Sequence, residues 1–256
     1  MKERVTLTIE ANLLRQIDAT VDGNTIRNRS HAVELLVREA IKGSLPEQAV
    51  VLAGGSTQAV DYVLQQVGGQ PVIKHNIDLL LDAGVQHILI ITKEPERIQE
   101  VLGDLEEANI QYVTETHSLG TAGALNLAQP YIEGTFILTN ADDKKTLDLT
   151  SMYDFHQQNN GLCTIALTST DEPSKYGVAL LNGNRIVTFV EKPSKDKSPS
   201  NLISAGMYFM EPEALKMIPQ GYGRIEYDLF PKLAKEDKLY GYPFSGEYEH
   251  YGPHTS

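Results

Sequence analysis

Two patterns of apolar residues divide the chain into parts of different character. Residues 4–9 (RVTLTI) alternate polar and apolar side chains, which is the period-2 pattern of a half-buried strand. Apolar residues then recur at helical spacing within residues 13–21 and again within residues 33–41, and Ser30 stands where the second helix needs an N-cap. We therefore predict a strand followed by two helices (β-α-α) over residues 1–43.

The remainder, residues 49–256, alternates short apolar strands with amphipathic helices after a linker at residues 44–48. This alternation is typical of an α/β domain with a doubly wound, mostly parallel sheet. A pair of strands around Asn182-Gly183 indicates a hairpin. The other expected strands are residues 49–55, 87–92, 110–115, 135–142, 162–168 and 203–211, and the expected helices are residues 72–85, 95–108, 121–132 and 149–160.

Composition narrows the choice of partners and compartment. The net charge of −12 argues against nucleic-acid binding by the whole surface, but residues 1–42 hold seven Lys/Arg against six Asp/Glu, so the negative charge lies in the remainder. No apolar run is long enough to cross a membrane, and the first residues lack the apolar core of a signal peptide. A single cysteine, Cys163, leaves no disulfide framework. We therefore expect a cytoplasmic protein without membrane contact.

The N-terminal pattern, RVTLTIEANLLRQID followed by RNRSHAVELLVREAI, resembles the ribbon-helix-helix family of DNA-binding proteins. In that family two chains pair their strands into a β-ribbon that enters the major groove. A segment this small also needs a second copy to bury enough apolar surface. The resemblance implies a homodimer, with a tetramer as a further assembly, bound to a double-stranded DNA operator. The implied DNA-binding residues are Lys2, Arg4, Thr6, Thr8, Arg29 and Ser30. A ribbon that only dimerises is the alternative.

Seven segments of the larger domain resemble, in order, the sugar-nucleotidyltransferases, which join a sugar 1-phosphate to a nucleoside triphosphate. They run from VLAGG at residues 51–55 to IEYDLFPKLAKEDKLYGY at residues 225–242. The resemblance implies that Asp142 binds Mg²⁺ and that, if the site is active, Asp142 and Lys192 serve catalysis. The residues implied for nucleotide and sugar binding are Ala53, Gly54, Gly55, Glu115, Gly120, Asp142, Gly177, Glu191, Lys192 and Gly206.

Three features depart from that family's pattern. The stretch at residues 56–70 is short and holds no Lys or Arg, although the family places a catalytic Arg and Lys after its glycines. His250 stands where a second metal-binding Asp is expected, and histidine is a poor ligand for Mg²⁺. Lys144 and Lys145 follow Asp142, and the simpler expectation is that both are solvated at a strand end rather than supplying replacement charge.

These departures favour binding over catalysis, because each lost transition-state donor costs on the order of 10²–10³ in rate. The leading interpretation is a sequence-specific transcriptional regulator whose catalytically impaired domain senses a nucleotide or sugar nucleotide, or assembles the protein. The alternative is an active, divergent sugar-1-phosphate nucleotidyltransferase with a DNA-binding tail, which needs Mg²⁺. A purely structural assembly module is a third class.

Overall fold

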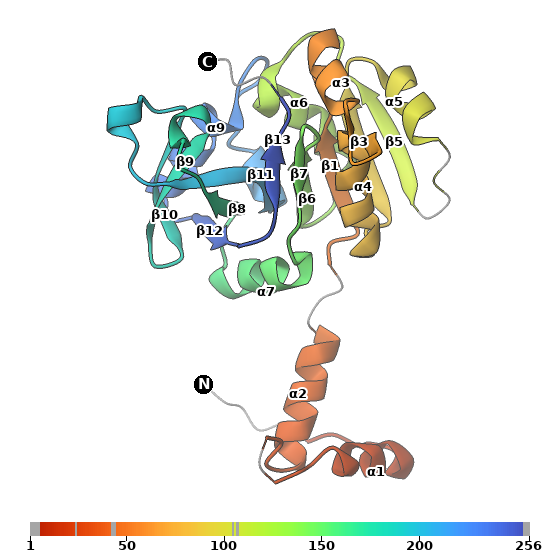
Figure 1. The fold of residues 1–256 in the computed structure, drawn as a ribbon. Helices are drawn as coiled ribbons and strands as arrows, with labels where there is room; N and C mark the ends of the chain where they lie inside the picture. The colour runs from red at the N-terminus through yellow and green to blue at the C-terminus, as the bar shows by residue number, and fades with distance from the viewer. Residues whose placement is uncertain (1–5, 24, 42–44, 104, 106–107, 253–256) are drawn as a thin grey trace. The chain divides into compact units, whose positions relative to one another are not determined.

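The computed structural model describes residues 6–23, 25–41, 45–103, 105 and 108–252. The chain forms two units, residues 1–44 and residues 45–256. Each unit is described separately below, and the elements of both are labelled in Figure 1. No helix among the described residues is long and apolar enough to cross a membrane.

The N-terminal unit contains two helices, α1 (Ala11–Ala19) and α2 (Arg29–Ile41). Ile17 and Ala32 are buried. Large apolar side chains also lie on its surface: Leu7, Leu13, Leu36 and Val37 are 61%, 52%, 45% and 43% exposed. This small unit therefore leaves much of its apolar surface uncovered.

Two local expectations for this unit differ from the structure. Residues 6–9, the described part of the expected strand, are not in a strand, since a ribbon strand needs hydrogen bonds from a second copy. Helix α2 is capped by Asn28 rather than Ser30, because the His31 N–H donates to Asn28 Oδ1 at 2.9 Å and Ser30 already lies in the first turn. The asparagine two positions earlier was thus the stronger capping signal.

The larger unit is built on a nine-stranded sheet in the order β5-β4-β1-β6-β11-β8-β12-β10-β9. The pairs β5–β4, β4–β1, β1–β6 and β8–β12 are parallel, whereas β11 runs antiparallel to β6 and β8. The sheet is therefore mixed, and the expectation of a mostly parallel sheet holds only for part of it. The strands are β1 (Gln48–Leu52), β4 (His87–Thr92), β5 (Asn109–Thr114), β6 (Phe136–Asn140), β8 (Cys163–Ser169), β9 (Gly177–Asn182), β10 (Arg185–Glu191), β11 (Leu202–Met210) and β12 (Leu239–Pro243).

Helices cover both faces of this sheet, as Figure 1 shows. Successive residues of β1 point to opposite faces: Val50 packs in the core beneath α6, and Val51 in the core beneath α4. This alternation gives the domain its two hydrophobic layers. The helices are α3 (Thr57–Val63), α4 (Val72–Asp82), α5 (Pro95–Leu102), α6 (Gly120–Ala128), α7 (Leu149–Asn159), α8 (Pro212–Leu215), α9 (Ile225–Asp228) and α10 (Phe230–Lys235).

Two small ribbons complete the fold near the carboxyl ends of the central strands. Strands β2 (Gln66–Val67) and β3 (Gln70–Pro71) form a hairpin between α3 and α4. Strands β7 (Asp143–Lys145) and β13 (Tyr248–His250) pair antiparallel, with His250 opposite Asp143. The second ribbon brings the C-terminal segment to the end of β6.

Candidate functional site

A cleft lies at the carboxyl ends of the central strands, the edge at which α/β sheets bind ligands. It consists of two adjoining cavities of about 200 Å³ and about 420 Å³. Both are lined by Ala59, Gly120, Thr121, Asn140 and Asp142, so they are continuous with each other. The smaller cavity also contacts Gly54, Gly55 and Glu115. The larger also contacts Lys175, Tyr176, Gly177, Glu191, Lys192, Ser204, Gly206, Tyr208, Arg224, Glu226, Tyr248 and His250.

The smaller cavity is closed on one side by Glu115, which follows β5. Its Oε1 accepts a hydrogen bond from the Leu119 N–H at 2.6 Å, and burial raises the pKa of its carboxyl group. Gly55 leaves room for this carboxylate, since a Cβ on Gly55 would lie 2.7 Å from Glu115 Oε2. Ala53 is fully buried among core side chains and does not line the cleft, contrary to its predicted binding role.

Gly120 joins the two cavities through a close backbone approach. It has a φ of +71°, and a Cβ there would lie 2.3 Å from the Gly223 carbonyl oxygen. The next residue, Thr121, donates to Glu226 Oε2 at 2.7 Å and accepts from the Ile225 N–H at 3.0 Å. Helix α6 is thereby fixed to α9, which places Glu226 and Arg224 at the cleft.

The short stretch after Gly55 folds into ordered local structure. Ser56 caps α3 by accepting from the Ala59 N–H at 3.1 Å, and the β2–β3 hairpin follows. This stretch brings no cation to the cleft. The Lys and Arg side chains that line the cleft, within the part of the chain that the structure describes, are Lys175, Lys192 and Arg224.

In the larger cavity the Glu191 carboxylate lies close to Gly177. A Cβ on Gly177 would lie 2.7 Å from Glu191 Oε2. Burial and the charge of Glu226 together raise the pKa of Glu191 to about 7. Lys192 has a φ of +44° and donates its backbone N–H to the Tyr176 carbonyl at 2.9 Å. A non-glycine residue in this region is strained, a feature that recurs at functional sites.

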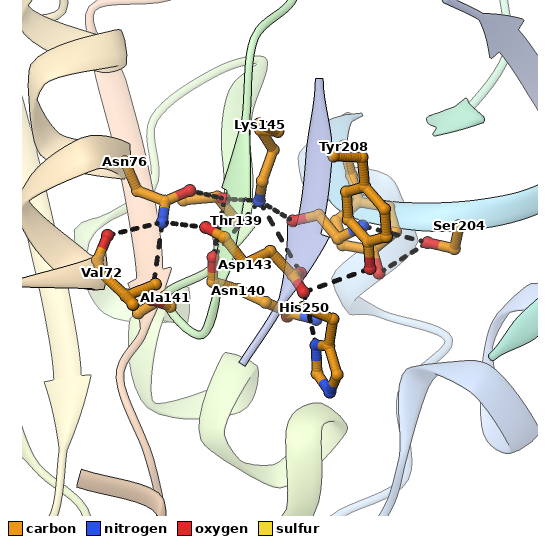
Figure 2. A network of polar contacts seen from close by, with 12 residues as sticks. Val72, Asn76, Thr139, Asn140, Ala141, Asp143, Lys145, Ser204, Tyr208 and His250 are labelled. Carbon is orange, nitrogen blue, oxygen red and sulfur yellow. Dashed lines mark hydrogen bonds and ion pairs between the residues drawn. The ribbon is translucent and has the colours of Figure 1, made fainter. Parts of the chain in front are cut away.

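A cluster of two carboxylates and one imidazole lies on the cleft wall next to Gly206. Asp142, Asp143 and His250 each offer one ligand atom, and these atoms lie within 4.8 Å of one another. The Asp143 Oδ1 atom is 2.6 Å from His250 Nδ1 (Figure 2). The same oxygen accepts from the Tyr248 hydroxyl at 3.2 Å. Burial and the Asp143 charge raise the pKa of Asp142 to about 6. Burial alone would lower the pKa of His250, but its hydrogen bond to Asp143 raises it.

Lys145 corrects an expectation from the sequence, because it is buried rather than solvated. Its Nζ donates to Thr139 Oγ1 at 3.0 Å and to the Gly206 carbonyl at 3.3 Å, and lies 3.9 Å from Asp143 Oδ2 (Figure 2). Burial lowers the pKa of Lys145, against the opposing charge of Asp143. Lys144 is partly exposed and lies 3.6 Å from Glu247. Successive side chains of β7 point to opposite sides of the strand, so Lys145 is buried and Lys144 is partly exposed.

Sequence reasoning therefore missed several residues of the cleft. Asp143 was next to a predicted ligand, but only the pairing of β7 with β13 shows its role. Thr121, Arg224 and Glu226 were assigned no role from the sequence, although Glu226 lies in the family-like segment of residues 225–242. The predicted residues that the fold does bring to the cleft are Gly54, Gly55, Glu115, Gly120, Asp142, Gly177, Glu191, Lys192 and Gly206.

The structure describes four of the six residues that were predicted to contact DNA. Lys2 and Arg4 lie outside the described residues, and Thr6 and Thr8 are exposed. Arg29 donates through Nε and Nη2 to both carboxylate oxygens of Asp18, each at 2.6 Å, so its fork is engaged within the unit. Ser30 is exposed on α2.

Known proteins resemble this chain over the larger unit. The nucleotidyl transferase family model matches residues 48–248. Mannose-1-phosphate guanyltransferase of Saccharomyces cerevisiae is 35% identical over 216 residues, covering 78% of this chain and 59% of that protein. Mannose-1-phosphate guanylyltransferase catalytic subunit beta of Danio rerio is 33% identical over 215 residues, with the same coverage. This chain therefore spans about 59% of the length of these curated relatives.

Solved structures agree on the fold. UDP-glucose pyrophosphorylase complexed with UDP-glucose superposes with a TM-score of 0.66 at 20% identity, covering 78% of this chain and 91% of that chain. A Bacillus anthracis structure that carries the name glucose-1-phosphate thymidylyltransferase, in complex with sucrose, has a TM-score of 0.71 at 21% identity and covers 79% and 89%.

These findings overturn the leading interpretation from sequence. A DNA-binding regulator with an impaired, sensing domain is wrong as the main function, because the relatives carry the names of sugar-1-phosphate guanyltransferases and support the enzyme alternative. None of these comparisons supports a ribbon-helix-helix domain or a DNA operator. The match over residues 48–248 shows that the chain belongs to the nucleotidyl transferase family.

Proposed function

We propose that this protein is a sugar-1-phosphate nucleotidyltransferase. A phosphate oxygen of the sugar 1-phosphate attacks the α-phosphorus of a nucleoside triphosphate, and the bond to pyrophosphate breaks. The observation that carries the proposal is the continuous cleft, with a cavity at Gly55 and Glu115 beside a larger one at Glu191 and Lys192. Two adjoining cavities of these sizes suit a nucleoside and a hexose phosphate.

The two cavities are lined by different kinds of side chain, which supports assigning the nucleoside to the smaller cavity and the sugar phosphate to the larger. The smaller holds small residues and one carboxylate, so a planar base can lie against the backbone at Gly54 and Gly55. The larger holds the cations Lys175, Lys192 and Arg224, which suit a phosphate. The sugar phosphate thus belongs in the larger cavity, with its reacting oxygen directed toward Gly120 and the nucleotide.

We further propose that the base is guanine and that Glu115 reads it. An ionised carboxylate accepts hydrogen bonds, and guanine presents two adjacent donors, N1–H and N2–H₂. Uracil and thymine present one N–H between two carbonyl oxygens, which a carboxylate would repel. The names of the relatives, which are mannose-1-phosphate guanyltransferases, support the same base and mannose 1-phosphate as the sugar.

In this proposal the larger cavity, which holds the sugar phosphate, also supplies the positive charge for the reaction. Both substrates are anionic, and charge neutralisation with positioning supplies most phosphoryl-transfer catalysis. Residues 56–70 hold no Lys or Arg. Arg224, supported by its contact to the Tyr222 hydroxyl at 3.2 Å, and Lys192 are the side chains placed to neutralise the transferring phosphate. Mg²⁺ is the ion that the family resemblance implies for an active site of this kind.

Calorimetric titration tests the nucleotide assignment. Guanosine triphosphate should bind at least tenfold more tightly than uridine or thymidine triphosphate, since one lost hydrogen bond to a charged group costs about 1.5–3 kcal/mol. Glu115→Gln should remove most of that preference. Equal binding of the three nucleotides by the unaltered protein would refute the role of Glu115.

For the N-terminal unit we propose self-association. Leu13, Leu36 and Val37 expose apolar surface on a unit of 44 residues, which is too small to bury it alone. Light scattering should give a multiple of the chain mass, and the Leu36→Glu/Val37→Glu variant should lower it. Val101→Glu, which alters an equally exposed valine (43%) of the larger unit, is the matched control. A monomeric mass for the unaltered chain would exclude this proposal.

A further inference from the structure

The metal cluster on the cleft wall does not fit the ion that the family resemblance implies. The family's Mg²⁺ lies between two Asp carboxylates, whereas here one of the donors is the His250 imidazole. Mg²⁺ is a hard ion that takes oxygen ligands in near-ideal octahedral geometry. An imidazole nitrogen suits first-row transition-metal ions such as Co²⁺, Ni²⁺ or Zn²⁺ better, because the affinity of a nitrogen-containing site rises from Mn²⁺ through Co²⁺ to Ni²⁺ and imidazole is a common Zn²⁺ ligand.

The charge of the cluster points the same way. Two carboxylates, Asp142 and Asp143, carry the negative charge of the cluster. The ammonium group of Lys145, with a side chain that is 0% exposed, lies 3.9 Å from Asp143 and offsets part of it. The nearby ammonium group weakens binding of a hard ion, which is held mainly by charge. It weakens binding less for an ion that also bonds to the imidazole nitrogen.

The imidazole is held in an orientation typical of metal-binding histidines. Its Nδ1 lies 2.6 Å from Asp143 Oδ1, and that oxygen also accepts from the Tyr248 hydroxyl at 3.2 Å. A histidine that donates one ring N–H to a carboxylate presents the lone pair of its other nitrogen to a metal. The pairing of β13 with β7 fixes this relationship in the backbone.

Gly252, which follows β13, lies against both the Asp142 carboxylate and the His250 imidazole. A Cβ on Gly252 would lie 2.2 Å from Asp142 Oδ2 and 2.8 Å from His250 Cε1. Glycine at this position therefore lets Asp142 and His250 approach each other.

We infer that Asp142 and His250, with Asp143 orienting the imidazole, form a site for a first-row transition-metal ion of the Mn²⁺ to Zn²⁺ series in place of Mg²⁺, and that His250 sets this preference. The inference concerns binding of the metal ion alone. It stands or falls independently of the transferase reaction.

The test is a change in preference between variants, because most nitrogen- and oxygen-containing sites bind Co²⁺ more tightly than Mg²⁺. Co²⁺ is titrated into the full chain and followed by its visible absorption, and Mg²⁺ is then added as a competitor. His250→Asp should lower the ratio of Co²⁺ to Mg²⁺ affinity by about 10- to 100-fold, the range expected for altering a metal-site residue. His87→Asp is the matched control, since His87 is exposed at the opposite end of its strand, and it should leave the ratio unchanged.

Two results would overturn the inference. One is an affinity ratio that is the same in the unaltered chain and in His250→Asp. The other is no binding of Co²⁺ at millimolar concentration by the unaltered chain. If His250→Asp fails to fold, as judged by circular dichroism, His250→Gln measures the same ratio, because it removes the imidazole and keeps a hydrogen-bonding side chain of similar size. A failed transferase assay would not bear on this inference, because the titration measures binding of the metal ion alone.

Discussion

The Asp143 carboxylate lies 2.6 Å from His250 Nδ1, although 107 positions separate the two residues. Their contact depends on the β7–β13 ribbon, which sets His250 opposite Asp143. The other oxygen of Asp143 faces Lys145 at 3.9 Å. One buried carboxylate therefore joins the cleft wall to a lysine in the core.

Replacing that lysine should destabilise the larger unit. Lys145→Met removes the donor to Thr139 and Gly206 and leaves Asp143 without its buried countercharge. Breaking one side of a buried pair costs about 3–5 kcal/mol. Urea unfolding should show this loss, and Lys144→Met, which alters a partly exposed lysine of the same strand, should stay within about 0.5 kcal/mol. Equal stabilities for the two variants would contradict the role given to Lys145.

Glu191 should make stability depend on pH. Its pKa is about 7 in the folded chain, above the usual value of 4.5. Between these values the unfolded chain has released a proton that the folded chain keeps, so stability falls as pH rises through that range. The contribution is fully present below about pH 4.5 and is lost as pH passes 7. Unfolding at pH 5 and pH 8 should show a larger loss for the unaltered chain than for Glu191→Gln, in which Glu226 still titrates. Parallel changes in the two proteins would exclude Glu191 as the cause.

Filling the space at Gly55 should weaken nucleotide binding. Gly55→Ala places a methyl group 2.7 Å from Glu115 Oε2, so the carboxylate must move. Loss of one charged hydrogen bond, about 1.5–3 kcal/mol, predicts a roughly 10- to 100-fold rise in the Kd for guanosine triphosphate. Gly134→Ala is the control, because no heavy atom lies within 4 Å of its added Cβ. An unchanged Kd for Gly55→Ala would separate Glu115 from base recognition.

Removing the charge of Arg224 should slow the reaction. Arg224→Gln keeps a polar side chain at the cleft but loses the cation that we assign to the transferring phosphate. We expect kcat/KM to fall about 10- to 100-fold, the effect of one charge-assisted hydrogen bond. Arg97→Gln, which breaks surface ion pairs with Glu94 and Asp61, should leave kcat/KM unchanged. A similar rate for both variants would mean that other groups neutralise the phosphate.

Apolar periodicity was enough to predict the α/β class, because Val50, Val51 and their neighbours must fill two opposite faces of one sheet. It could not predict the antiparallel insertion of β11 between β6 and β8, which depends on pairing between distant strands. The strand expected within residues 4–9 is not seen over its described residues, 6–9, although their alternating pattern favours one.

The candidate site was predictable where short motifs carry a backbone requirement, as at Gly55 and Gly120. It was not predictable where a side chain's direction decides its role. Lys144 and Lys145 are adjacent and identical in type, yet only the second enters the core. Residues 56–70 hold no Lys or Arg, as the sequence shows, but sequence alone did not place Arg224 in the cleft.

The most direct test of the central proposal is the formation of product from defined substrates. The full chain is incubated with mannose 1-phosphate, guanosine triphosphate and either Mg²⁺ or Mn²⁺, and pyrophosphate release and the nucleoside diphosphate sugar are measured together by phosphorus NMR. We predict equal amounts of the two products, formed only when both substrates are present, with Arg224→Gln slower. If neither product forms with any of the four common ribonucleoside triphosphates or thymidine triphosphate, each paired with mannose or glucose 1-phosphate, the proposed transferase activity is contradicted.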